Sequence, residues 1–492
     1  MPKFWDIISV VFIAFSAELQ CKAYCSFDSD IKQIYQDILN LDLDKANAKV
    51  IEKGPNNLNQ AYLLLENYID FYQLFIHEQE ADFKKLAGNK NKRLTRIKVS
   101  GLVEPWSNFL RAEILLQWAL IYLKREDYFL ALQDISQATT LLNEAIVKFP
   151  EFSYSYKSMG ILHALLSSIP EGWSWATKLM GLGGNLAEGK KELLQFICFA
   201  ELKDDMFLME SYVAMSFIKT YLDNSPKEAY QYFSDKIWKT DPNPLLAFVH
   251  SKLAMRAGYN EATLNSILSL PQADRNKLPV LHFILGLAKL QKLSPDADVY
   301  FLQFLKQTKS ELYVKEAFQK LSWHAIIFNN IDMYHHWIQK GLHQGKLRSD
   351  EDRQAQLYFS VHKTPQPILL KARLLCDGGY AKEGLQLLKG LMPSMIIDPE
   401  YQLEACYRMG RLYQLLEQEK DAIYYFDLAI RMDPNERSFM STQAILQKAI
   451  LAEKQRNSKL AKEYFQRVLK RNPEQYQRSL HQKAQAGLSR IK

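Results

Sequence analysis

Hydrophobic residues recur at helical spacing along most of the chain, and short polar breaks divide these stretches into pairs. Apolar side chains three or four positions apart share one face of an α-helix, so each stretch predicts an amphipathic helix. Helix pairs are expected within residues 242–270, 278–309 and 311–343, and another over 206–223 and 226–238. In the first half, helices are expected over 31–39, 43–52, 58–86, 107–124, 128–149 and 154–168.

A repeated pattern of small and aromatic residues begins near the C-terminus. Within residues 406–434, six positions match the pattern small, aromatic, small, aromatic, small, proline: Gly410, Tyr413, Ala422, Phe426, Ala429 and Pro434. Small residues let two antiparallel helices approach, the aromatic rings fill the gaps between them, and proline ends the second helix. The segment resembles a tetratricopeptide repeat, and we expect Gly410 to face Ala422 across the helix pair.

The same pattern returns 39 residues later, with Ala449, Ala452, Ala461, Phe465, Val468 and Pro473 in the equivalent places. A weaker copy 38 residues upstream contains Ala372, Leu375, Gly384 and Leu388. Stacked helix pairs bury their apolar faces on one another. We therefore predict an all-α fold, an α-solenoid of tetratricopeptide-like helix pairs with a long-helix N-terminal region. Its expected parts are an N-terminal helical region (24–200), a repeat array (201–473) and a capping helix (474–492).

The N-terminus carries the features of a signal peptide, which we assign to residues 1–23. Lys3 precedes an apolar core at residues 7–15, too short to span a bilayer, and small residues follow. The best cleavage site lies after Ala23, which predicts an exported protein: periplasmic, envelope-associated or secreted. Three alternatives stay open: cleavage near Ser16 or Ala17; lipidation at Cys21, which Gln20 disfavours because a small residue is expected there; and a buried first helix of the fold.

Composition supports a large helical protein. The chain of 492 residues has 19 glycines and 17 prolines, which is too few for the frequent turns of a β-sandwich, β-barrel or β-propeller. Hydrophobic residues at 48% and charged residues at 24% exclude disorder. The five cysteines are widely spaced and form no CxxC motif, so neither a disulfide scaffold nor a zinc site is expected. Cys198 and Cys376 lie in apolar stretches and are expected to be buried.

The net charge of +7 is modest, yet seven basic residues and no acidic ones lie between residues 84 and 98. One interpretation is a solvated loop, favoured by Gly88, Asn89 and Asn91. The other is a peripheral contact with a membrane or an acidic partner, through Lys90, Lys92, Arg93 and Arg96. No nucleic acid is expected as a partner, because aromatic residues do not alternate with these charges.

A glycine-rich stretch follows residue 168 and includes Gly181, Gly183, Gly184 and Gly189. It lacks the residues of a phosphate-binding loop, so we expect a tight corner where two helix backbones approach closely. The sequence MGILHALLSSIP, followed by KLMGLGGNLAEGKKEL, resembles the tetratricopeptide repeat protein 39 and inclusion-body-clearance family. That resemblance implies a helical protein with no established catalytic site, associated with interactions and with handling of lipid or aggregates.

No catalytic or cofactor-binding motif is present in the sequence. His336 and His343 are seven residues apart, about 10 Å along a helix, too far for one metal ion. We therefore predict a non-catalytic scaffold, without cofactor or metal, that binds a protein or peptide partner on its concave face. The alternative is a carrier of a lipid or other apolar molecule, in a cavity between the N-terminal helices and the solenoid that Trp173 and Trp175 would line.

Overall fold

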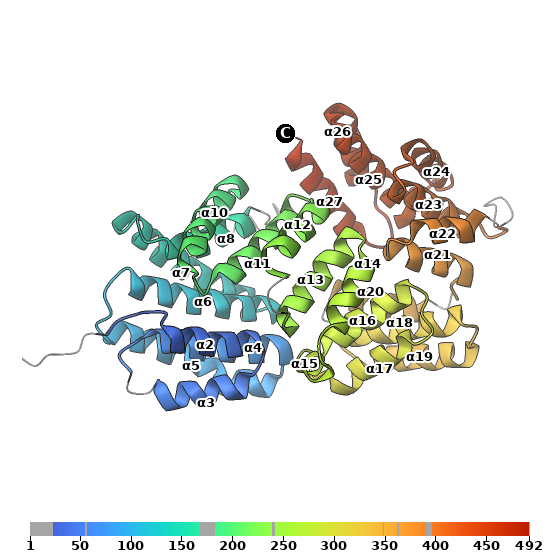
Figure 1. Ribbon diagram of the computed structural model, residues 1–492. Coiled ribbons are helices and arrows are strands. Elements are labelled where there is room, and N and C mark those ends of the chain that lie inside the picture. The colour runs from blue at the N-terminus through green and yellow to red at the C-terminus, as the bar shows by residue number, and fades with distance from the viewer. Residues whose placement is uncertain are drawn as a thin grey trace, which may run out of the picture.

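The computed structural model describes residues 23–54, 57–167, 183–238, 242–347, 349–361, 364–389 and 396–491. These residues form 25 α-helices, and adjacent helices pack as antiparallel pairs. Figure 1 shows the pairs stacked side by side, from the blue N-terminal helices through the yellow central helices to the red C-terminal helices. The prediction of an all-α solenoid is confirmed. The proposed signal peptide lies outside the described residues, except for Ala23, which is buried.

The N-terminal helices follow the predicted segments except over residues 58–99. The segment 58–86 was expected to form one helix, but Glu78 adopts a left-handed backbone (φ 56°) and separates α4 from α5. Residue 200, the expected boundary of this region, falls inside the last turn of α10. The helices are α2 (Ser29–Leu39), α3 (Leu43–Lys53), α4 (Ala61–His77), α5 (Glu80–Val99), α6 (Trp106–Lys124), α7 (Tyr128–Lys148), α8 (Tyr154–Leu166) and α10 (Leu186–Lys203).

The close backbone approach predicted from the glycine-rich stretch is found where α8 packs on α10. A Cβ atom built on Gly160 would lie 2.6 Å from the backbone nitrogen of Leu193, and one on Gly189 would lie 2.6 Å from that of Ala164. Real Cβ atoms do not approach so closely, so only glycine allows the two helices this contact. Residues 168–182, which include Gly181, Trp173 and Trp175, lie outside the described residues.

The second half of the chain continues as stacked pairs, and each predicted pair is found. Two helices, α11 and α12, continue as π-helical turns, η2 (Ile218–Leu222) and η3 (Ser234–Trp238). The helices are α11 (Leu208–Phe217), α12 (Pro226–Phe233), α13 (Pro244–Ala257), α14 (Asn260–Leu268), α15 (Gln272–Lys277), α16 (Val280–Gln291), α17 (Ala297–Gln307), α18 (Val314–Ile327), α19 (Ile331–His343), α20 (Asp350–Ser360), α21 (Pro367–Asp377), α22 (Ala381–Lys389), α23 (Pro399–Leu415), α24 (Glu419–Arg431), α25 (Phe439–Lys454), α26 (Ser458–Lys470) and α27 (Gln477–Arg490).

One packing device recurs along the array: a helical glycine lies directly against a buried phenylalanine ring of a neighbouring helix. A Cβ atom built on the glycine would lie 2.5 Å or less from the ring in three of the pairs and 3.1 Å from it at Gly286, so the ring fills the groove between the two helices. The four glycine–phenylalanine pairs are Gly286 with Phe301, Gly341 with Phe359, Gly410 with Phe426, and Gly487 with Phe465. The last pair attaches α27, the expected capping helix, to α26.

Two turns of the array that are far apart in sequence touch each other. The turn between α21 and α22 packs on the turn between α13 and α14, where a Cβ atom built on Gly379 would collide with the carbonyl oxygen of Gly258. Beside this contact, the Asn260 amide donates a hydrogen bond to the Tyr380 hydroxyl (3.0 Å) across a separation of 120 residues. Helix α21 also packs on α16 and α18, so this part of the array closes on itself.

Candidate functional site

A groove runs along α13 and α16, the first helices of two successive pairs. It has a volume of about 320 Å³. Its floor is apolar, with Phe283 and Ile284 of α16 only 3% exposed. The full lining is Tyr221, Lys252, Met255, Arg256, Val280, Phe283, Ile284, Leu287, Tyr313 and Glu351.

Two cations of α13 enter this groove without a counter-ion. Lys252 and Arg256 are one helical turn apart, and no acidic side chain of the described residues lies within ion-pair distance of either. Burial lowers the pKa of Lys252, although Glu316 and Glu351 partly offset that effect. An anion that approaches a partly desolvated lysine stabilises the charged form of its side chain, because the Coulomb attraction offsets the solvation lost on burial.

Positive charge extends from the groove toward the C-terminal helix. Lys483 of α27 is exposed, but partial desolvation, together with repulsion from Arg256 and Arg411, lowers its pKa. Glu351 is near enough to act in the opposite direction. Helix α27 therefore contributes to the same electrostatic environment as α13. The arrangement suits an occupant with apolar side chains and at least one acidic group.

The groove residues were not predicted from the sequence. The available signal was the pair Lys252 and Arg256, which interrupts an otherwise apolar helix at i, i+4 spacing. That spacing places both side chains on one helix face, but only the structure shows that the face lies over α16. Tyr221 and Glu351 join the groove from segments about 30 and 100 residues away along the chain, and no local pattern links them.

The first repeat places its predicted packing residues within one helix pair, α23 and α24. Ala422, Phe426 and Ala429 are fully buried, and Pro434 lies three residues beyond the end of α24. The structure differs in the partner of Gly410. The three atoms nearest to a Cβ atom built there all belong to the Phe426 ring, the closest at 2.5 Å, and none belongs to Ala422.

Aromatic stacking completes that pair, and the second repeat follows the same plan. The ring of Tyr413 stacks on that of Tyr425, with centroids 5.4 Å apart. In the pair α25 and α26, Ala449, Ala461 and Phe465 are each 0% exposed. Pro473 lies three residues after α26 ends at Lys470, as Pro434 does after α24. These residues pack the two repeats, and none of them lines the groove along α13 and α16.

The basic segment forms helix α5, so the expectation of a loop is wrong. Two of its cations are used inside the protein. The Arg93 guanidinium is buried and lies 2.7 Å from an Asp70 carboxylate oxygen. The Lys90 ammonium lies 2.8 Å from the Asp134 carboxylate. The remaining cations of the helix are exposed: Lys84, Lys85, Lys92, Arg96 and Lys98.

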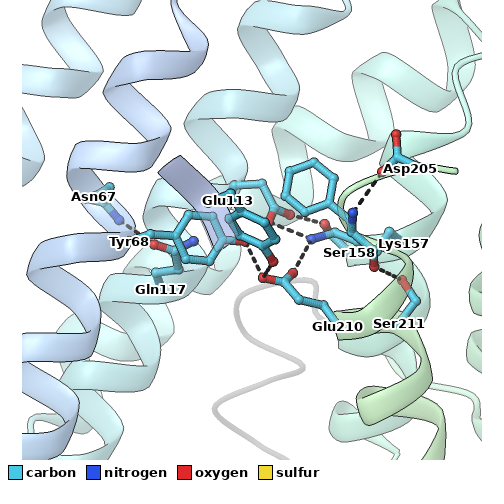
Figure 2. Close-up of polar contacts among 11 residues, drawn as sticks. Asn67, Tyr68, Glu113, Gln117, Lys157, Ser158, Asp205, Glu210 and Ser211 are labelled. Atoms are coloured by element: carbon cyan, nitrogen blue, oxygen red, sulfur yellow. Dashed lines mark hydrogen bonds and ion pairs between the residues drawn. The ribbon is translucent and has the colours of Figure 1, made fainter. Parts of the chain in front are cut away.

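Figure 2 shows a buried polar network that joins the N-terminal helices to α11. At its centre, the Lys157 ammonium lies 2.8 Å from Glu113 and 3.2 Å from Glu210. The hydroxyls of Tyr35 and Tyr68 donate to Glu210 at 2.5 and 2.6 Å. Burial alone would lower the pKa of Lys157, but Glu113 and Glu210 raise it above its ordinary value. Since every member is partnered within the protein, the network stabilises the helix packing.

The other candidate residues are dispersed. His336 and His343 line a shallow cavity of about 310 Å³ on α19, with no acidic or cysteine side chain in its lining. Cys376 is buried as predicted, whereas Cys198 is exposed, so the prediction for Cys198 is wrong. All cysteines among the described residues are free thiols. No helix in the described ranges is both long and apolar enough to cross a bilayer.

Comparisons with known proteins identify the repeats. Residues 403–436 and residues 443–474 each match a family described as tetratricopeptide repeat. A search of curated proteins found no match. Among solved structures, the apo form of the quorum sensor NprR from B. thuringiensis covers 82% of this chain and 97% of its own length, at 10% identity and a TM-score of 0.33. The human IFIT1 dimer with PPP-AAAA covers 84% of this chain and 98% of its own, at 14% identity and a TM-score of 0.37. The helix pairs and the two family matches together define the protein as an all-helical solenoid that contains tetratricopeptide repeats.

Proposed function

We propose that this protein is a non-catalytic scaffold that binds a protein or peptide partner in the groove along α13 and α16. The observation that carries the proposal is the pair of cations without counter-ions, Lys252 and Arg256, above the apolar floor made by Phe283 and Ile284. Tetratricopeptide repeats are generally binding modules, and stacked repeats create extended concave surfaces for partners.

The expected partner is a peptide segment that alternates apolar and acidic side chains. Its apolar side chains would cover Phe283 and Leu287, and an aspartate, a glutamate or a terminal carboxylate would pair with Lys252 and Arg256. An anion there would also relieve the repulsion between Arg256 and Lys483. A partner of this kind gains its affinity from burial and its orientation from charge.

Affinity purification with matched charge reversals tests this function. The tagged mature protein is compared with a Lys252→Glu, Arg256→Glu variant and with a control that carries Lys420→Glu and Lys462→Glu. The control lysines are exposed on α24 and α26, the second helices of their pairs. A groove partner should co-purify with the wild type and the control but not with the groove variant. Equal recovery with all three proteins would refute the assignment to this groove.

The carrier alternative would place its cavity against Trp173 and Trp175, which lie outside the described residues. Two cavities among the described residues lie elsewhere, one on α19 and one along α13 and α16. The glycines that carry the resemblance to the tetratricopeptide repeat protein 39 family include Gly160 and Gly189, whose role in packing α8 on α10 needs no ligand. We therefore take no function from that resemblance.

We also propose that the protein is exported, on the basis of Lys3 and the apolar core at residues 7–15. The mature chain would then begin at Tyr24, whose backbone forms hydrogen bonds with Leu58 and Gln60. N-terminal sequencing of protein purified from its native host should find Tyr24 first. Recovery of a chain that retains residues 4–15 would contradict export by this signal.

A further inference from the structure

Three side chains with metal-ligating atoms converge between α8 and α10. They are His163 of α8 and Glu188 and Glu192 of α10, and one ligating atom from each lies within 4.8 Å of the other two. The His163 Nδ1 atom is 2.7 Å from a Glu192 carboxylate oxygen. The side chains of His163 and Glu192 are 20% and 15% exposed, so the group sits at the protein surface, where an ion can enter.

The close approach of the two helices positions this histidine. Gly189 separates the two glutamates, and a Cβ atom built on it would lie 3.1 Å from the His163 Cβ atom. The imidazole is therefore held against the backbone of α10, beside two carboxylates one helical turn apart. Gly160, one turn before His163, permits the same approach from α8. The packing that fixes the helix pair thus also fixes three ligating side chains relative to one another.

The cluster lacks the paired cation that several other enclosed carboxylates of this protein have. Glu113 is paired with Lys157, and Asp134 with Lys90. Within the described ranges, no lysine or arginine forms an ion pair with Glu188 or Glu192. Two carboxylates and an imidazole with no cation beside them form a favourable place for a divalent ion.

We propose that His163, Glu188 and Glu192 bind a divalent transition-metal ion, with Zn²⁺ as the representative ion. One imidazole nitrogen and two carboxylate oxygens are donors that zinc accepts at about 2.0–2.2 Å. Ligating atoms of a tetrahedral zinc site are then about 3.4 Å apart. The nitrogen and oxygen of the His163–Glu192 hydrogen bond must separate by less than 1 Å to reach that spacing. Three protein ligands leave a fourth position for water.

A hydrogen-bonded histidine–glutamate pair without metal is the rival explanation, and zinc binding distinguishes the two. The full chain is prepared without a polyhistidine tag and with Cys198→Ser, because that exposed thiol could itself bind zinc. After treatment with a chelator, the protein is titrated with Zn²⁺ against a chromophoric competitor. The visible spectrum of its Co²⁺ form is recorded as a second readout.

The variants are His163→Ala, Glu192→Gln and Glu188→Gln, with His336→Ala as a matched control on α19. The proposal predicts one zinc ion per chain, and an affinity that falls at least about tenfold in each ligand variant and stays unchanged in the control. Glu188 is exposed, so its variant tests the site without disturbing the fold. Failure of the parent chain to bind Zn²⁺, or binding by Glu188→Gln and His163→Ala as tight as that of the parent, would overturn the proposal.

Discussion

Replacing Gly410 with alanine tests the packing of the first tetratricopeptide repeat. The added methyl group would start 2.5 Å from a Phe426 ring carbon, about 1 Å inside a normal carbon–carbon contact. The ring is 0% exposed, so it has no space into which to withdraw. Overpacking of this kind costs about 1–3 kcal/mol. Alanine also favours helix over glycine by about 1 kcal/mol, so the expected net destabilisation is about 0–2 kcal/mol.

A matched substitution separates those two contributions. Gly88 lies inside α5, and a Cβ atom built there meets nothing within 4 Å. Gly88→Ala should therefore stabilise its helix by about 0.5–1 kcal/mol. Because both substitutions add the same helix propensity, the difference between their effects gives the packing cost at Gly410 alone. We expect that difference to be about 1–3 kcal/mol.

Hydrogen exchange of backbone amides is the suitable assay. The last tryptophan of the chain is Trp337, so tryptophan fluorescence does not report on α23 and α24, and repeat arrays need not unfold in one step. Exchange of peptides from residues 403–436 reads the repeat directly, and about 1.4 kcal/mol corresponds to a tenfold change in rate.

A second substitution decides whether the Phe426 ring is the cause. Adding Phe426→Leu to Gly410→Ala removes the clash, so the double variant should be more stable than the sum of the single effects by about 1 kcal/mol. Additive effects would show that the ring does not limit the space at Gly410. Slower exchange in Gly410→Ala than in the wild type would refute the packing argument altogether.

Three further predictions follow from the buried groups and the basic helix. Lys157→Met leaves two carboxylates without their cation and should destabilise the N-terminal helices by about 3–5 kcal/mol in denaturant unfolding. Burial lowers the pKa of His250 and of His282 to about 4; the unfolded chain therefore binds more protons between pH 6.5 and 4, and stability falls as the pH falls through that range. His250→Gln with His282→Gln should flatten that dependence. If the exposed cations of α5 contact a membrane, Lys92→Gln with Arg96→Gln should weaken binding to anionic vesicles, most clearly below about 0.15 M salt, without changing the denaturation midpoint; unchanged binding would exclude a membrane contact through α5.

The sequence predicts the helix pairs because their signals are local. Gly410, Phe426 and Pro434 lie within 25 residues and report one helix–turn–helix unit. The interpretation of the basic segment as a loop failed for a related reason. Gly88, Asn89 and Asn91 weaken the helix propensity of that segment, yet the burial of Leu86, Arg93 and Ile97 on one face holds α5 in place. Tertiary contacts override a weak local preference there.

The candidate sites depend on contacts that no local pattern encodes. Glu210 meets Tyr35 across 175 residues of chain, and Glu351 shares a groove with Arg256. His163 and Glu192 are 29 residues apart and meet only because α8 and α10 touch at two glycines. A sequence shows which side chains carry charged or metal-ligating groups. In the network, the groove and the His163 cluster, however, the stacking of helix pairs decides which of these side chains meet.

The contact between the turns at Gly258 and Gly379 has a mechanical consequence. In a solenoid whose helix pairs contact only their neighbours, pulling on the ends separates successive pairs along the whole array. In this protein the backbone contact between Gly258 and Gly379, together with the hydrogen bond between Asn260 and Tyr380, connects two pairs that are distant in sequence. Tension on the chain should therefore separate the pairs α23–α24 and α25–α26 before it deforms the segment between residues 258 and 379. A partner bound beside α16 would then contact a surface that keeps its shape while the C-terminal helices move apart.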